Sequence, residues 1–449
     1  MNKENQENQE NQENQTNENN FLAENSQFLD IHLIFPLLEF ILKEKLRPEN
    51  EIFQTMLELA QQTNLFDIEF RAFRKLNNTN DIPKEMLDRK DQVEQKEKLL
   101  FQKIKVFIDL INGSLEDKIP DLLSQNSLTM EFLKEKYKIE NQTLNLLFEY
   151  SRLIYDKGEY EKAIKTLELY IILENKSDKQ LEGLWGKLVC EISTQKMEEG
   201  EKTIQSIREI IEKTLPKSNQ RYQLKCAGFL MHWSLFVFFN SPNGLNQLID
   251  LFFNDLYNSV IQTFAPHLLR YLCVAVFLDQ QRRSSMRNLL RLIDQEKYRY
   301  SDPITELIYS TFSKKNLNNI ESQIEKCEKF CTQDFFLFGI KDQFISSIRV
   351  SIFEIFCKIY HELSFDVFVK QLRINPDDVE NWIVNVIRNS NINAKVDSEN
   401  RKIIIQQHFM NVLQNINYKI KNVPQKLSNI NLAIQEIEAK QNPVIPQEK

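Results

Sequence analysis

Two pairs of side chains in this sequence have the residue types and the spacing of metal ligands. Cys327 and Cys331 are four residues apart, and so are Cys357 and His361. Residues with this spacing share one face of a helix, so the two pairs could together supply four zinc ligands. Free cysteine is also common in helical cores, and structural zinc sites more often place a cysteine pair on a knuckle. We therefore interpret these residues as core and predict no metal or cofactor, with zinc as the alternative.

The remaining candidates for catalysis lack the partners that catalysis needs. His232 and His267 stand alone, because the sequence places no Ser or Cys nucleophile and no paired acid beside them. The segment from Gly183 to Leu188 contains Gly-Lys, but it lacks the glycine spacing, the Ser or Thr and the preceding strand of a phosphate loop. No zinc-protease, kinase or nucleophile-elbow motif is present. We predict core or surface histidines, no enzyme activity and no small-molecule substrate.

A basic stripe on one predicted helix is formed by Arg283, Arg287 and Arg291, which recur every four residues, together with the adjacent Arg282. Such a stripe could hold RNA phosphates, or it could pair with acidic groups of a neighbouring hairpin or partner, or remain solvated. A net charge of −7 and a pI near 5.6 argue against broad nucleic-acid affinity, because that affinity depends on many Lys and Arg facing phosphates. Any RNA contact must therefore be local.

The composition indicates a mainly α-helical chain. Eight Gly and twelve Pro in 449 residues are too few for the tight turns of α/β or all-β folds. The hydrophobic content of 42% is ample for a large core, but a single core rarely grows beyond roughly 250 to 300 residues. A chain of 449 residues therefore favours an elongated, stacked array of helices. Six Cys without a secretory leader, and no apolar run near the roughly 20 residues of a membrane span, predict a soluble, cytoplasmic protein.

Four regions follow along the chain. Residues 1–20 form a disordered tail of Asn, Gln and Glu. Residues 21–340 read as helical hairpins, in which Pro36 can restart a helix, 85–111 form one long helix and 245–256 another. Gly158 and Ala163 fit the turn and the close helix contact of a tetratricopeptide repeat. Residues 341–405 are predicted to contain a winged helix, and 406–449 C-terminal helices and a tail.

The winged-helix prediction is based on the spacing of the hydrophobic residues, which changes from one in about 3.6 residues, typical of a helix, to every second residue, typical of a strand. A helix is predicted over 365–372, and a second over 376–391 with Asn375 as N-cap and Pro376 at its first position. Residues 392–397 and 402–405 alternate as two antiparallel strands. The second helix carries Asp377, Asp378 and Glu380 against Arg388, which disfavours DNA reading.

The exposed edge of the wing could instead pair with a strand of another subunit. The helical stripes after the wing could bundle with partner helices or fold back on their own domain. The predicted partner-binding residues are Ile392, Ala394, Val396, Ile403 and Ile405 of the wing and Phe409, Val412, Ile416 and Ile420 of the following helix.

Helical hairpins that lead into a winged helix resemble the PCI module of subunits of the proteasome lid, the signalosome and translation initiation factor three. Five collinear blocks narrow this resemblance to one PCI family within eukaryotic initiation factor three, that of its E component; they are Leu29–Phe40, Leu184–Leu188, His232–Asn240, Asp302–Glu306 and Trp382–Asn389. Residues 1–20 and those after Ile405 depart from the family pattern.

The resemblance implies a right-handed, tetratricopeptide-like solenoid with a terminal PCI domain. It also implies a noncatalytic scaffold that joins other PCI and MPN subunits, among them the D component of the same factor, on the small ribosomal subunit during initiation. Contact with the large scaffold protein of the cap-binding complex is implied as well. The alternatives are a PCI subunit of the proteasome lid or signalosome, or a winged-helix nucleic-acid binder.

Overall fold

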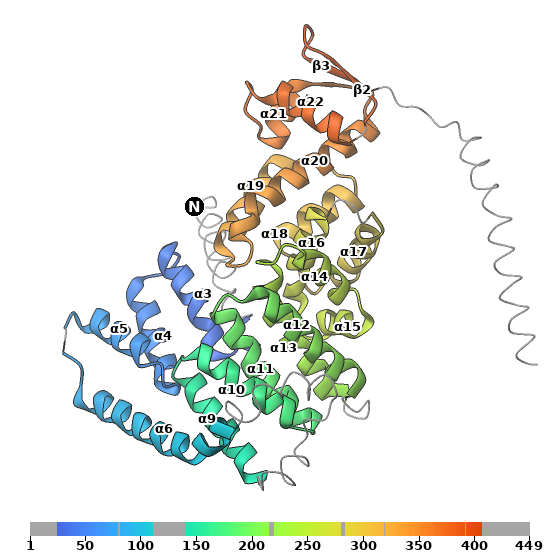
Figure 1. Cartoon of the computed structure of the whole chain (residues 1–449). Helices are drawn as coiled ribbons and strands as arrows, with labels where there is room; N and C mark the ends of the chain where they lie inside the picture. Colours follow the sequence, from blue (N-terminus) through green and yellow to red (C-terminus); the bar gives the residue numbers. More distant parts are fainter. Residues whose placement is uncertain are drawn as a thin grey trace, which may run out of the picture. The chain divides into compact units, whose positions relative to one another are not determined.

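The computed structural model describes residues 25–79, 81–110, 141–214, 220–279, 283–317, 319–390 and 392–405 (Figure 1). These residues are mostly helical, with three short strands near the C-terminal end of the described chain. The chain divides into two compact units, 1–348 and 349–449, and the division falls inside helix α20 (Lys341–Ile359). The predicted fold class, helical hairpins followed by a winged helix, is confirmed.

Unit 1 begins with three helices around a shared apolar core, namely α3 (Ile31–Lys43), α4 (Glu49–Gln62) and α5 (Phe66–Asn77). The prediction that Pro36 restarts a helix is wrong, because Pro36 lies inside α3. The helix starts earlier, where the Asp30 side chain accepts a hydrogen bond from the backbone N–H of His32. Burial of Leu33 and Leu37 on either side of Pro36 offsets the backbone hydrogen bond that proline cannot make.

The next helices form the repeat-like part of unit 1. The predicted long helix is α6 (Lys84–Leu110), with 27 residues. It packs on α9 (Asn141–Asp156), which forms a hairpin with α10 (Tyr160–Leu173). Gly158 turns the hairpin at a φ of 81°, where a Cβ atom would meet Leu65 Cδ2 at 2.7 Å, and Ala163 is fully buried. Both assignments made from the repeat pattern are confirmed.

Successive helices continue to pack on their neighbours: α10 on α11 (Ser177–Ser193), α11 on α12 (Met197–Glu209), and α12 on α13 (Gln220–Phe238). A π-helical turn, Ile210–Thr214, extends α12. The single helix predicted over 245–256 is two helices, α14 (Gly244–Phe252) and α15 (Asp255–Thr263). The break occurs because the Asn254 side chain accepts from the N–H of Leu256 and caps a new helix.

Unit 1 ends in shorter helices. A 3₁₀ turn, Pro266–Leu268, leads into α16 (Leu269–Leu278), followed by α17 (Arg283–Glu296), α18 (Pro303–Ile308), a π-helical turn (Tyr309–Ser313), α19 (Ile320–Gln333) and a 3₁₀ turn (Phe338–Ile340). The sequence predicts a helix start at Pro303 with Asp302 as its cap. This start is confirmed, because Asp302 and Thr305 form a reciprocal capping box at the start of α18. No single helix in the described ranges is long and apolar enough to cross a membrane; α15 and Pro266–Leu278 meet that criterion only as a pair bent by 119°.

Unit 2 contains the winged helix. Helix α21 (Phe365–Leu372) matches its prediction, and the strands β1 (Glu362–Ser364), β2 (Ala394–Asp397) and β3 (Lys402–Ile405) form an antiparallel sheet in the order β1-β3-β2. Helix α22 (Val379–Ser390) starts three residues after the predicted position, since residues 376–378 form a turn in which the N–H of Asp378 bonds Asn375 O at 3.1 Å. The sequence pattern gave no sign of β1.

Candidate functional site

The structure contains the predicted wing, and the predicted contact side chains on it are either buried or half-buried. Strands β2 and β3 pair antiparallel, as predicted, and their register places Ala394 opposite Ile405 and Val396 opposite Ile403. Ile403 and Ile405 are buried in unit 2, whereas Ile392, Ala394 and Val396 are half-buried. Within the described chain β2 pairs only with β3, so its other side is a backbone edge. The wing therefore offers a strand edge, while Ile403 and Ile405 of β3 are turned into its own core and Ile404 is exposed.

The other predicted contact residues are only partly described. Phe409, Val412, Ile416, Ile420 and Arg282 lie outside the described residues. Arg283 is the first residue of α17. Arg287 and Arg291 are exposed on α17, while the apolar residues Leu289, Leu292 and Ile293 are buried. The described part of the basic stripe therefore lies on a solvent-facing side of an amphipathic helix.

Three of the four candidate zinc ligands are buried thiols, and the fourth, His361, is exposed. The side chains of Cys327 and Cys331 are fully buried, and the Cys327 S–H donates to Pro303 O at 3.0 Å. Burial raises the pKa of the Cys331 and Cys357 thiols, which favours the protonated form over the thiolate that binds metals. Among the described residues, no group of three or more His, Cys, Asp or Glu is arranged to hold a metal ion.

The two histidines that stand alone in the sequence lie together in the fold. His232 Nε2 is 2.8 Å from His267 Nε2, and His232 Nδ1 is 2.7 Å from Gly228 O. The carbonyl fixes the proton of His232 on Nδ1, so Nε2 accepts from the N–H of His267. Burial lowers the pKa of His232 to about 4 and that of His267 to about 2. The pair is therefore neutral, and the ring of Phe28 stacks on His232 at 4.3 Å.

A second buried polar group surrounds Arg270, which the sequence patterns did not indicate. The Arg270 Nη2–H group donates to the Tyr300 hydroxyl at 2.8 Å, and that hydroxyl donates to Asp302 Oδ2, also at 2.8 Å. Arg270 Nη1 lies 3.6 Å from Asp334 Oδ2, which also accepts from the Tyr271 hydroxyl at 3.0 Å. Arginine, both carboxylates and Tyr271 are buried. We call this group the Arg270 cluster.

Electrostatics explain why this cluster needs its arginine. Burial raises the pKa of Asp334, and the positive charge of Arg270 opposes that rise. Hydrogen bonds from Tyr271 and from the backbone N–H groups of Phe336 and Leu337 also favour the carboxylate. The guanidinium lies 5.1 to 5.9 Å from the ring centres of Phe330, Tyr271 and Tyr300. The cluster is therefore a guanidinium site that the chain fills itself.

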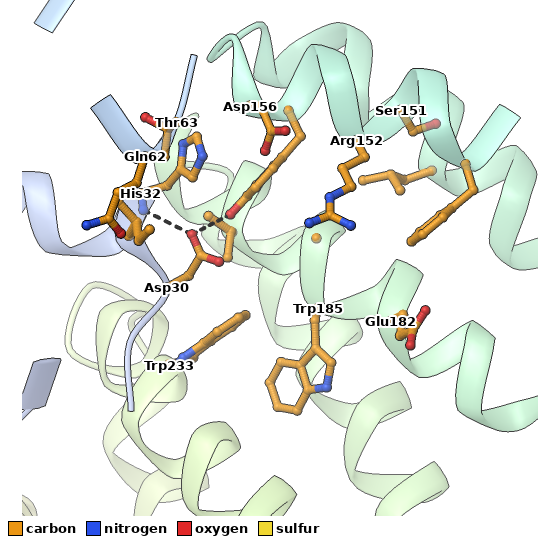
Figure 2. Close-up of a pocket in the computed structure, with 16 residues that line it drawn as sticks. Asp30, His32, Gln62, Thr63, Ser151, Arg152, Asp156, Glu182, Trp185 and Trp233 are labelled. Atoms are coloured by element: carbon orange, nitrogen blue, oxygen red, sulfur yellow. Dashed lines mark hydrogen bonds between the residues drawn. The ribbon is translucent and has the colours of Figure 1, made fainter. Parts of the chain in front are cut away.

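A cavity of about 470 Å³ lies where five helices and one helix start meet in unit 1 (Figure 2). Its lining comes from the start of α3 (Asp30, Ile31, His32), the end of α4 (Gln62, Thr63), α9 (Phe148, Ser151, Arg152, Tyr155, Asp156), α10 (Leu167), α11 (Glu182, Trp185, Gly186, Val189) and α13 (Trp233). Figure 2 shows Asp30 between Trp233 on one side and Asp156 and Arg152 of α9 on the other. We call it the Asp30 pocket.

Hydrogen bonds fix the floor of this pocket. The Tyr155 hydroxyl donates to Asp30 Oδ1 at 2.7 Å, and the Trp233 indole N–H donates to Phe28 O at 2.8 Å. The rings of Trp185 and Trp233 meet edge to face, with centres 4.7 Å apart. These contacts join residues far apart in the sequence, so the walls are positioned before any ligand enters.

The pocket carries more negative than positive groups. Asp30, Asp156 and Glu182 line it, against the single cation Arg152. Burial raises the pKa of Asp156; Arg152 opposes the rise and the neighbouring Asp30 adds to it. Burial also lowers the pKa of His32, whose Nδ1 is 3.0 Å from the Tyr160 hydroxyl. The pocket therefore suits a positively charged group better than an anion.

The sequence held a signal for part of this pocket. Asp30 and His32, Trp185 and Trp233 belong to three of the five blocks that carried the family resemblance. The sequence pattern favours a core position for Trp185, but this residue is half-buried in the pocket wall. No comparable signal marked Arg152 or Asp156, because a repeat pattern treats them as ordinary polar positions of a hairpin.

Comparison with known proteins gives two family matches. A model of the eIF3 subunit 6 N terminal domain matches residues 20–153, and a PCI domain model matches residues 324–407. The chain is 32% identical over 395 residues to the E subunit of eukaryotic translation initiation factor 3 from Arabidopsis thaliana, covering 86% of this chain and 89% of that relative. It is 31% identical over 404 residues to the protein of the same name in Culex quinquefasciatus, covering 89% and 91%. The Sclerotinia sclerotiorum protein of that name is 30% identical over 405 residues and covers 89% of each chain.

Proposed function

Because the chain belongs to the family of the E subunit of eukaryotic translation initiation factor 3, we propose that it is a noncatalytic scaffold component of this factor. In this role it assembles with other PCI and MPN subunits on the small ribosomal subunit during initiation, in the cytoplasm. The D component of the factor and the large scaffold protein of the cap-binding complex are further proposed partners.

The backbone edge of β2 carries this proposal. Within the described chain β2 has a strand neighbour on one side only, and the sheet lies inside the region that matches the PCI domain. An exposed edge can be completed by a strand of another chain, because its N–H and C=O groups are already arranged for pairing. We therefore assign the shared sheet to β2, with Ile392, Ala394 and Val396 beside the partner strand.

Exposed Arg287 and Arg291 on α17 support a separate contact. Their spacing fits ribosomal RNA phosphates or an acidic partner segment, and both alternatives stay open. The net charge of −7 confines such a contact to this local stripe.

Purification of the tagged full-length chain tests the scaffold role. Mass spectrometry of the copurifying proteins should identify initiation factor 3 subunits and small-subunit ribosomal proteins. Recovery of proteasome-lid or signalosome subunits in their place would contradict the proposal and support the alternative assignment.

Two neighbouring proline variants test the strand edge. In an antiparallel strand, adjacent residues direct their N–H groups to opposite sides, so only one of Lys395→Pro and Val396→Pro removes an outward N–H. That variant should keep its far-UV circular dichroism spectrum and recover fewer PCI subunits, whereas the other should disturb the sheet itself. Equal recovery of partners by two folded variants would exclude the β2 edge.

A further inference from the structure

The Arg270 cluster shows how this fold holds a guanidinium group. A helix-capping aspartate, Asp302, accepts from a tyrosine hydroxyl, and aromatic rings flank the arginine between this carboxylate and that of Asp334. The Arg270 Nε atom lies 3.8 Å from Asp302 Oδ2 and Nη1 3.6 Å from Asp334 Oδ2. The site combines two carboxylates with aromatic faces, which is the usual chemistry of arginine recognition.

The Asp30 pocket contains similar parts, and the one cation in its lining, Arg152, forms no ion pair with its carboxylates in the part of the chain that the structure describes. Asp30 also caps a helix and also accepts from a tyrosine hydroxyl, and Asp156 supplies a second carboxylate. Trp185 and Trp233 supply the aromatic walls. Among the described residues no Lys or Arg forms an ion pair with Asp30 or Asp156, and Arg152 is exposed. The pocket thus combines carboxylates and aromatic rings, as the Arg270 cluster does, but around an open cavity.

We propose that the Asp30 pocket binds an arginine side chain of a partner polypeptide. The guanidinium lies between Asp30 and Asp156 and stacks on the indole of Trp185. Asp30 Oδ1 is used by Tyr155 and by the helix cap, which leaves Oδ2 for the ligand. Glu182, which is exposed and lines the pocket, adds to the attraction for the incoming cation.

Size and polarity also fit a peptide segment. A cavity of about 470 Å³ lies within the range of ligand sites, and it is larger than one guanidinium requires. His32 lines this cavity with its side chain buried, and its Nε2 has no hydrogen-bond partner in the described chain. When Nδ1 accepts from the Tyr160 hydroxyl, Nε2 carries the proton and suits a backbone carbonyl of the entering segment.

Tryptophan fluorescence of the full-length chain tests the proposal directly. The probe is the blocked peptide Gly-Gly-Arg-Gly-Gly, titrated into the millimolar range, with Lys, Glu or the neutral isostere citrulline replacing Arg in three parallel titrations. The Arg peptide should change the emission of Trp185 and Trp233, with weaker binding as NaCl rises. Trp382 belongs to unit 2 and supplies a constant background, and Trp185→Phe should remove most of the signal change.

Substitution of Asp30 and Asp156 tests whether their carboxylates recognise the arginine of the peptide. Asp30→Asn keeps a helix cap and an acceptor for Tyr155, so this variant should retain the fold. Its affinity for the Arg peptide should fall by about tenfold, because a charge-assisted pair is lost. Asp156→Asn should act in the same direction. Glu161→Gln on α10 removes an exposed acid outside the pocket and should leave binding unchanged. Far-UV circular dichroism checks the fold of each variant.

Several outcomes would overturn the proposal. These are equal binding of the Arg and citrulline peptides, tighter binding of the Lys or Glu peptide, absence of saturable binding, or binding that Asp30→Asn leaves unchanged. The proposal rests on the proposed function only in taking the arginine from a partner subunit. The peptide titration needs no other subunit, so its failure would leave the copurification result standing, and the reverse also holds.

Discussion

Asp302 and Asp30 both cap a helix and both accept a hydrogen bond from a tyrosine, but within the described chain only Asp302 forms an ion pair with an arginine. At the Arg270 cluster the guanidinium is buried and paired with two carboxylates. At the Asp30 pocket similar groups surround a cavity. The same local motif therefore serves internal packing in one place and leaves room for a ligand in another.

The difference teaches that burial, more than residue type, separates a structural cluster from a binding site. A buried charge must be paired inside the chain, because an unpaired one costs several kcal/mol. A charge next to an open cavity can remain solvated until a partner supplies the opposite charge. The exposed Arg287 and Arg291 stand at the other extreme, since water solvates both and their removal leaves no buried group unpaired.

The strongest test of this contrast replaces Arg270. Arg270→Met should lower the free energy of unfolding by about 3 to 5 kcal/mol, since Asp334 is left as an uncompensated buried carboxylate. Urea denaturation followed by far-UV circular dichroism measures the change. Arg287→Met on exposed α17 is the matched control and should stay within about 0.5 kcal/mol of the unmodified chain. A loss below about 1 kcal/mol in Arg270→Met would mean that the cluster does not depend on its cation.

Acid should act on the neutral His232–His267 pair. The folded-state pKa of His232, about 4, lies below the ordinary value of 6.5, so the unfolded chain binds protons first as the pH falls. Stability is therefore complete above pH 6.5 and is lost toward pH 4; between pH 7.5 and 5 the loss from this group is about 2 kcal/mol. Unfolding midpoints across this window measure it.

The control for the acid effect is the double variant His232→Asn, His267→Asn, which should be less stable at neutral pH and should lose this part of the pH dependence. The charge of Arg270 also contributes to the lowered pKa of His267, after burial and His232. A pH dependence that is unchanged in the double variant would assign the acid effect to other groups.

The smallest effect on stability is expected for the exposed arginines. Arg287→Glu with Arg291→Glu should change the free energy of unfolding by no more than about 0.5 kcal/mol while weakening cosedimentation with small ribosomal subunits. Lys326→Glu with Lys329→Glu reverses the same amount of charge on α19 and serves as control. Unchanged cosedimentation, or an equal loss in the control, would exclude the stripe as a specific contact.

Helices and their caps were largely predictable because they depend on neighbours in the sequence. The apolar spacing before Leu110 gave α6, and the Asp302–Pro303 signal gave the start of α18. The errors at Pro36, Asn254 and Pro376 concern helix ends. There, a weak local preference competes with burial and with side-chain caps that the tertiary structure selects.

The sequence alone determined the fold class, the wing hairpin and the family, because hydrophobic period and collinear motif letters are properties of local order. Only the tertiary structure decided which polar residues meet. Tyr155 reaches Asp30, Trp233 reaches Phe28, and His267 reaches His232 across 125, 205 and 35 residues of sequence. Each pairing depends on how successive helices pack, which no local pattern encodes, and the same packing leaves the cavity beside Asp30 open while it closes the space around Arg270.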